Sequence, residues 1–268
     1  MKKKRLDIIL IEKGLFSARE KAKAAIMAGE VMVDGICVDK AGALIDDGAD
    51  IIVKSKQLPY VSRGGLKLAK AIEVFELDLQ GKIILDIGSS TGGFVDCALQ
   101  RGAIKVYAVD VGYGQLAWSL RKDERVVVLE KTNARYLTTD EIGEKVDLIT
   151  VDASFISLAK VLPASIQFLP ADGLLIALVK PQFEAGKEKV GKKGVVRDKD
   201  VHKQVLQKVC ADMQGLGMMP RALDFSPITG PNGNIEYLLL AKKNTDRLLA
   251  VDNLIIEAVV EHAWQEHK

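Results

Sequence analysis

Short apolar runs alternate with helical patterns from Leu66 onward, and this alternation limits the possible folds more than any other feature. The runs that predict buried strands are residues 83–86, 106–110, 126–129, 146–152 and 174–180. Such alternation is typical of a mostly parallel sheet with helices on both faces. A further run, 236–241, predicts a late strand that pairs antiparallel with a neighbour near Ala222. We therefore predict an α/β fold built on a Rossmann-like sheet.

The first part of the chain, residues 5–54, predicts a separate small unit of the α+β class. Two short helical patterns come first, and the second opens with the capping-box sequence Ser17-Ala18-Arg19-Glu20. A hairpin and a further short strand follow. A unit of this size buries little area by itself, which favours a binding module. The polar segment 54–63 predicts a linker, and we divide the chain into residues 1–58 and 59–268.

Basic residues gather in two parts of a chain whose formal net charge is only +2. The first cluster opens the chain and is diluted by Asp7, Glu12 and Glu20, and the second lies between Lys187 and Arg197. Basic surfaces attract polyanions such as nucleic acids. For either cluster alone, a lysine-rich face that is merely solvated remains the alternative.

Cysteine and histidine are too few and too scattered to predict a metal centre or a disulfide framework. The three cysteines show no paired spacing, and the three histidines form no ligand cluster. No apolar run approaches the ~20 residues that span a bilayer. The N-terminus lacks the apolar core of a signal peptide. We therefore expect a cytoplasmic protein with no bound metal and no stable membrane association.

A glycine-rich turn between the first strand and the next helix predicts a cofactor site. Its residues are Asp86, Gly88, Ser89, Ser90, Thr91, Gly92, Gly93 and Phe94. Glycines let a ligand approach the backbone closely, and such a turn equally suggests a dinucleotide site. Three details favour S-adenosylmethionine: the glycine spacing departs from G-x-G-x-x-G, Asp86 would repel a pyrophosphate, and the small side chains leave room for a zwitterionic methionine.

Three later segments would complete this cofactor site. Asp110 ends the next strand about twenty residues on, where a carboxylate can bind both hydroxyls of a ribose. Asn133 and Ala134 follow the third strand, in a position suited to the adenine. Asp152 ends the fourth strand at the carboxyl edge, where such sheets bind their ligands.

Asp152 and Lys180 each end a strand at this edge and are candidates for catalysis. Transfer of a methyl group to a hydroxyl needs an aligned oxygen that loses its proton, together with a nearby cation. Lys180 follows an apolar strand, and an apolar setting lets a lysine act as a base. The alternative is that both are solvated strand ends. A cysteine-dependent base methyltransferase is disfavoured because Cys97 and Cys210 lie in helical patterns, as small core residues do.

The N-terminal unit resembles the RNA-binding domain first seen in small-subunit ribosomal protein four. The matching residues are Arg5-Leu6-Asp7, Gly14, Ser17-Ala18-Arg19, Ala22, Ile26, Gly29 and Val31-Met32-Val33-Asp34-Gly35. The resemblance implies that basic side chains on the helical face meet RNA phosphates. These are Arg5, Arg19, Lys21 and Lys23. Phosphate contacts give affinity and position without reading sequence.

The whole chain resembles the TlyA or haemolysin A family of ribosomal-RNA ribose methyltransferases, which is related to the FtsJ type. The motifs that carry this resemblance are 61–68, 86–94, 151–157, 179–186, 194–198, 226–231 and 234–237. It implies a Lys67, Asp152, Lys180 and Glu236 tetrad, with S-adenosylmethionine as the cofactor and ribosomal RNA or ribosomal subunits as partners. Lys180 would be the base, oriented by Asp152, while Lys67 and Glu236 hold the target hydroxyl and balance charge.

We expect further RNA contacts from the methyltransferase part of the chain. The basic residues concerned are Arg63, Lys187, Lys189, Lys192, Lys193 and Arg197. The lysines and glycines of the segment 187–197 suggest a mobile loop that orders on RNA. Two other functions stay open, a membrane-active haemolysin and a non-catalytic protein that binds ribosomal RNA.

Overall fold

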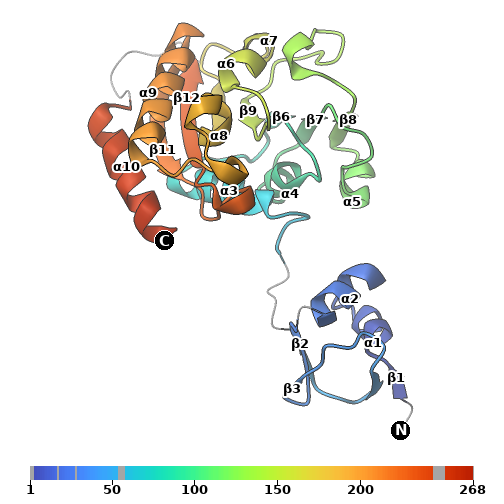
Figure 1. Cartoon of the computed structure of the whole chain (residues 1–268). Helices are drawn as coiled ribbons and strands as arrows, with labels where there is room; N and C mark the ends of the chain where they lie inside the picture. Colours follow the sequence, from blue (N-terminus) through green and yellow to red (C-terminus); the bar gives the residue numbers. More distant parts are fainter. Residues whose placement is uncertain (1–2, 17, 28, 54–57, 244–250, 268) are drawn as a thin grey trace. The chain divides into compact units, whose positions relative to one another are not determined.

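The computed structural model describes residues 3–16, 18–27, 29–53, 58–243 and 251–267. The chain divides into two compact units, Met1–Leu58 and Pro59–Lys268 (Figure 1). Two of the sequence predictions, the capping residue Ser17 and the first part of the linker segment, residues 54–57, fall outside the described residues.

In its described residues, the N-terminal unit contains two helices and five short strands. Its elements are β1 (Lys3–Arg5), α1 (Leu6–Glu12), α2 (Arg19–Met27), β2 (Val31–Val33), β3 (Ile36–Cys37), β4 (Leu44–Asp46) and β5 (Ile51–Val53). The sheet order β3-β2-β5 includes the predicted hairpin, whose turn residues Asp34 and Gly35 both have positive φ. The antiparallel pair β1–β4 was not predicted. A small core that includes Leu6, Leu10 and Ile26 joins the helices to this sheet.

The larger unit is built on a seven-stranded sheet in the order β11-β12-β10-β9-β6-β7-β8. Its strands are β6 (Ile83–Ile87), β7 (Lys105–Val109), β8 (Val126–Leu129), β9 (Leu148–Val151), β10 (Leu174–Val179), β11 (Met218–Phe225) and β12 (Tyr237–Lys243). The first five run parallel to one another, and β12 runs antiparallel to both β10 and β11. The predicted Rossmann-like α/β class, with its late antiparallel strand, is therefore confirmed.

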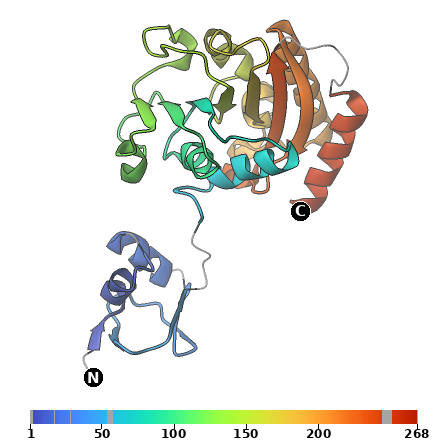
Figure 2. The same ribbon diagram turned by 180° about the vertical axis from the view of Figure 1, so that it is seen from behind.

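Helices cover both faces of this sheet (Figures 1 and 2). They are α3 (Gly64–Val74), α4 (Gly93–Gln100), α5 (Trp118–Arg121), α6 (Leu158–Val161), α7 (Pro163–Ile166), α8 (Pro181–Glu184), α9 (Lys199–Gly215) and α10 (Asn253–Glu266), with 3-10 turns η1 (Ala134–Tyr136), η2 (Lys187–Lys189), η3 (Lys192–Gly194) and η4 (Pro231–Gly233). Successive strand residues point to opposite faces, so Ile84 joins the core under α3 and α4, and Leu85 joins the core under α9 and α10. Cys97 and Cys210 are buried, one in each core.

The strand order reverses between β6 and β9. From β6 the chain moves outward through β7 and β8, and it then crosses back to β9 and β10 on the other side. The crevice outside the carboxyl ends of the strands at such a point is where open α/β sheets bind ligands. Within the described part of the chain, no helix is both long enough and apolar enough to cross a membrane.

Candidate active site

Four predicted residues meet at the carboxyl edge of the parallel strands. Asp152 follows β9 and Lys180 follows β10. Glu236 immediately precedes β12, and because β12 is antiparallel its first residue lies at the same edge. Lys67 reaches this edge from the first turns of α3. The fold thus brings together residues that are up to 169 positions apart in the chain.

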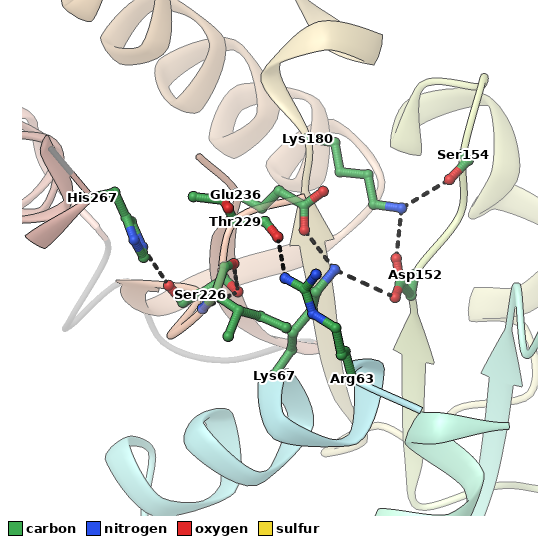
Figure 3. A network of polar contacts seen from close by, with 10 residues as sticks. Arg63, Lys67, Asp152, Ser154, Lys180, Ser226, Thr229, Glu236 and His267 are labelled. Atoms are coloured by element: carbon green, nitrogen blue, oxygen red, sulfur yellow. Dashed lines mark hydrogen bonds and ion pairs between the residues drawn. The ribbon is translucent and has the colours of Figure 1, made fainter. Parts of the chain in front are cut away.

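These side chains form one connected network of ion pairs (Figure 3). Lys67 Nζ lies 2.6 Å from Glu236 Oε2 and 3.9 Å from Asp152 Oδ2. Lys180 Nζ lies 2.6 Å from Asp152 Oδ1 and donates a hydrogen bond of 2.9 Å to Ser154 Oγ. Asp152 therefore connects the two lysines, and Ser154 is a contact that the sequence patterns did not reveal.

The network is buried and contains equal numbers of positive and negative groups. Lys67 and Lys180 are each 8% exposed, and Glu236 is fully buried. Removing one member of such a network leaves an uncompensated buried charge, which is strongly destabilising. The expected apolar setting for Lys180 was wrong, because the ammonium lies between a carboxylate and a hydroxyl. Glu236 Oε1 is buried and has no hydrogen-bond partner among the described residues, so it can accept one from a ligand.

The loop 226–236 forms one wall of the site. Arg63 donates a hydrogen bond of 3.0 Å to the carbonyl of Thr229, and the ring of His267 contacts the carbonyl of Ser226 at 2.9 Å (Figure 3). A Cβ atom added at Gly230 would lie 2.1 Å from Glu236 Oε1, so a side chain there would displace the glutamate. Part of the hydrogen-bonding capacity of Arg63 is therefore used to hold this wall.

Two adjoining cavities open at this edge. One, of about 450 Å³, is lined by all four network residues together with Arg63, Ser89, Gly93 and Phe94. The other, of about 480 Å³, is lined by Asp110, Gln115, Thr132, Asn133, Ala134 and Arg135. Gly88, Ser90, Asp152 and Ser154 line both, so the two cavities form the lobes of one site.

The glycine-rich turn packs closely against the backbone at the end of β9. Gly88 has φ +83°, and a Cβ atom added there would lie 2.7 Å from the carbonyl oxygen of Asp152. Asp110 Oδ2 accepts a hydrogen bond of 2.8 Å from the Ser90 N–H, and its Oδ1 accepts one of 2.7 Å from the Gly112 N–H. Both oxygens retain lone pairs, so ribose hydroxyls can still bind this carboxylate. The residues present therefore fit an adenosine-containing cofactor.

Three of the predicted cofactor residues line neither lobe. Thr91 and Gly92 lie further along the turn, and Asp86 is fully buried. Asp86 Oδ1 accepts a hydrogen bond of 2.6 Å from the Thr150 hydroxyl, and Oδ2 has no hydrogen-bond partner in the described ranges. Burial, with smaller contributions from Asp152 and Asp110, raises the pKa of Asp86 to about 7. Because Asp86 is buried in β6, just before the glycine-rich turn, it would influence the conformation of the turn rather than contact a ligand.

Asp86 gives the larger unit a pH-dependent stability. Its folded-state pKa of about 7 exceeds the ordinary value of 3.8, so the folded protein keeps a proton that the unfolded chain releases between these values. Stability in the absence of ligand should therefore fall as the pH rises, by about 1 kcal/mol per unit between pH 5 and 7. Urea denaturation of the wild type and of Asp86→Asn at pH 5 to 8 would measure this. If the free energy of unfolding changed with pH equally in the two proteins, the raised pKa of Asp86 would be contradicted.

The basic segment 187–197 is connected to the wall of the site. Lys187, Lys189, Lys192, Lys193 and Arg197 are all exposed. Asn232 donates a hydrogen bond of 2.9 Å to the carbonyl of Lys193, and Asn234 donates one of 3.0 Å to that of Gly194. The segment forms the turns η2 and η3, and its mobility remains a prediction.

In the N-terminal unit, Asp7 pairs with both arginines of the predicted basic face and so offsets part of its charge, as predicted. Asp7 itself is fully buried rather than on the surface. Arg5 donates two hydrogen bonds of 3.0 Å to its carboxylate, and Arg19 donates one of 3.0 Å. The Arg5 guanidinium, followed by that of Arg19, lowers the pKa of Asp7 to about 2. Lys21 is exposed, and Lys23 pairs with Glu20 at 2.8 Å.

Comparison with known families agrees with this geometry. The model of the FtsJ-like methyltransferase family matches residues 60–243, and that of the S4 domain matches residues 4–51. The chain belongs to the FtsJ-like methyltransferase family. It is thus an S-adenosylmethionine-dependent methyltransferase with an N-terminal S4 domain.

Three relatives show how far the similarity of this FtsJ-like methyltransferase extends. A candidate rRNA methyltransferase of Bacillus subtilis, YqxC, is 54% identical over 89% of this chain and 85% of its own. The 16S/23S rRNA (cytidine-2'-O)-methyltransferase TlyA of Mycobacterium tuberculosis is 46% identical over 98% of this chain and 97% of its own. The solved structure of a candidate hemolysin from Streptococcus thermophilus covers 99% of this chain and 97% of its own, with 46% identity and a TM-score of 0.78.

Proposed function

We propose that this protein methylates the 2'-hydroxyl of a ribose in ribosomal RNA. The observation that carries the proposal is the connected network of Lys67, Asp152, Lys180 and Glu236 beside the cofactor lobe. The similarity to a relative named as a ribosomal-RNA cytidine-2'-O-methyltransferase supports the same reaction. The four residues are the tetrad implied by the family resemblance, and all lie within one cavity.

The proposed roles follow from the positions of the side chains. S-adenosylmethionine, when bound, supplies a methyl group on a positively charged sulfur. Lys180 in its neutral form takes the proton from the target hydroxyl, and Asp152 orients its amine from 2.6 Å. Glu236 accepts a hydrogen bond from the substrate through Oε1, which has no partner among the described residues, and Lys67 holds that carboxylate in place at 2.6 Å.

The cofactor residues divide between the two lobes. Gly88, Ser89, Ser90 and Gly93 would hold the methionine end in the lobe that contains the tetrad. In the other lobe, Asp110 would bind the ribose hydroxyls, and Asn133 and Ala134 would border the adenine. Gly88 and Asp152 line both lobes, so they would border the middle of the bound cofactor.

Recognition of the substrate would depend mainly on phosphate contacts. The S4 domain supplies basic side chains such as Lys21, and the exposed lysines of 187–197 lie beside the active-site wall. Such contacts position RNA without reading its sequence, so the target nucleotide would be selected by the shape of ribosomal RNA. We place the reaction in the cytoplasm, where ribosomal subunits are found.

The direct test uses methyl-labelled S-adenosylmethionine and separated ribosomal subunits from a strain that lacks the gene. We expect a labelled 2'-O-methyl nucleoside after digestion of the RNA. A labelled base would overturn the assigned tetrad, and tight RNA binding without label would favour a non-catalytic binding protein. Release of a dye from lipid vesicles, with no methyl transfer, would favour the membrane-active haemolysin.

A further inference from the structure

Glu184 is a buried carboxylate to which the proposed reaction assigns no role. It ends α8, the single helical turn that begins directly after Lys180, and its side chain is only 2% exposed. Its Oε1 atom accepts a hydrogen bond of 2.7 Å from the N–H of Leu158, the first residue of α6. Burial of a carboxylate is unfavourable unless its hydrogen bonds compensate, so this contact calls for a physical explanation.

The segment that Glu184 holds belongs to the active site. Residues 152–157 connect β9 to α6, and they carry both Asp152 and Ser154. Ser154 Oγ accepts a hydrogen bond of 2.9 Å from Lys180 Nζ. Within the same loop, Phe155 has φ +65°, a conformation that costs about 1–3 kcal/mol and persists only where the surroundings hold it.

The contacts from α8 that hold this loop include the hydrogen bond between Glu184 and Leu158. They also include the ring of Phe183, whose centroid lies 5.1 Å from that of Phe155. Phe155 itself is 90% exposed, so the rest of the molecule gives its ring little support. The hydrogen bond of Glu184 is therefore a buried connection between the strand end that bears Lys180 and the loop that bears Ser154.

These contacts close a ring through the active site. From Lys180 the chain runs through α8 to Glu184, whose carboxylate bonds to Leu158. From Leu158 the loop leads back to Ser154, whose hydroxyl bonds to Lys180 Nζ. We propose that Glu184 is a positioning residue that fixes Ser154 against Lys180 and so sets the direction in which the Lys180 amine faces its substrate.

This inference rests on the proposed role of Lys180. A purely structural role for Glu184 is the alternative, and the chain offers a comparison at a carboxylate remote from the site. Asp147 Oδ2 accepts a hydrogen bond of 2.9 Å from the N–H of Ile83, where β6 begins at the opposite edge of the same sheet. A carboxylate that holds a backbone N–H is thus present far from the tetrad, and its removal reports the cost in stability alone.

The experiment compares Glu184→Ala, Glu184→Gln and Asp147→Ala in the full-length protein. Since the side-chain oxygen of glutamine can still accept from the Leu158 N–H, Glu184→Gln should retain most of the wild-type kcat. Glu184→Ala should lower kcat about 10- to 100-fold, with KM for S-adenosylmethionine within about twofold, because a misplacement of about 1 Å has effects of this size. Asp147→Ala should lower the melting temperature and leave kcat unchanged. A similar loss of kcat in Asp147→Ala, or none in Glu184→Ala, would overturn the proposal.

A second measurement separates this proposal from the proposed function. The rate at which N-hydroxysuccinimidyl acetate modifies Lys180, followed by peptide mass spectrometry, reports how the amine is held without any need for turnover. We expect faster modification in Glu184→Ala and in Ser154→Ala, and no additional increase when both are combined, because both changes open the same ring. An unchanged rate in Glu184→Ala would refute the positioning role, whether or not the protein methylates RNA. If the wild type transfers no methyl group, the proposed function fails while this comparison still decides the role of Glu184.

Discussion

Replacement of Lys180 by alanine is expected to lower kcat for methyl transfer about 10³-fold, the size of effect typical of a general base. The affinity for S-adenosylmethionine should change little, because Lys180 is not among the residues proposed to hold either end of the cofactor. Loss of the Lys180 ammonium should lower the stability, because it leaves the network with one more carboxylate than cations. The fold should still survive, since Asp152 is 20% exposed in its side chain and keeps Lys67 at 3.9 Å. Single-turnover transfer to ribosomal RNA and calorimetric titration with the cofactor measure the two effects.

Two further variants define what Lys180 does. Arginine keeps the positive charge but cannot give up its proton, so Lys180→Arg should be almost as inactive as the alanine variant. Substantial activity in Lys180→Arg would mean that the charge matters and that the base lies elsewhere. Lys70→Ala is the matched control, because Lys70 lies one turn from Lys67 and pairs with Asp224 at 3.2 Å without lining either lobe. It should retain the wild-type kcat.

Much of the sheet could be predicted because its strands are buried on both faces. Such strands are almost continuously apolar, which makes runs like 174–180 easy to identify. The pair β1–β4 could not be found in this way. Its residues Lys3–Arg5 are polar and mostly exposed, and they pair with Leu44–Asp46 some forty residues later. Neither strand has an apolar alternation that would indicate a sheet.

The candidate site was predictable only in part, for a related reason. Asp152 and Lys180 follow predicted parallel strands, so their convergence at one edge could be inferred from the strand pattern. Lys67 lies on a helix and Glu236 precedes an antiparallel strand, and only the family resemblance indicated them. The bonds of Ser154 to Lys180 and of Arg63 to Thr229 depend on loop conformations for which the sequence has no periodic signal.

The double variant Arg5→Ala/Arg19→Ala is expected to unfold the S4 domain. Both arginines pair with the fully buried Asp7, and their loss would leave a buried carboxylate without a cation. We expect a cost of about 3 kcal/mol, at the lower end for broken buried pairs because the arginines are half exposed. A domain of some fifty residues has a total stability of only about 3–7 kcal/mol. Protection from hydrogen exchange over residues 3–53 and the affinity for ribosomal RNA should therefore fall together.

The pH dependence of this domain follows from the same carboxylate. The folded-state pKa of Asp7, about 2, lies below its ordinary value of 3.8, so its ion pairs stabilise the domain above pH 4 and this contribution is lost as the pH falls toward 2. The triple variant Arg5→Ala/Asp7→Ala/Arg19→Ala removes the buried charge together with its partners and should fold again. One outcome is that the refolded triple variant still binds RNA weakly, and that the slope of log affinity against log salt concentration falls by about one for each lost phosphate contact. That result would show that the arginines contact RNA directly. If its affinity returns to the wild-type value, the two arginines serve only to neutralise Asp7, and the RNA contacts must come from other basic side chains such as Lys21.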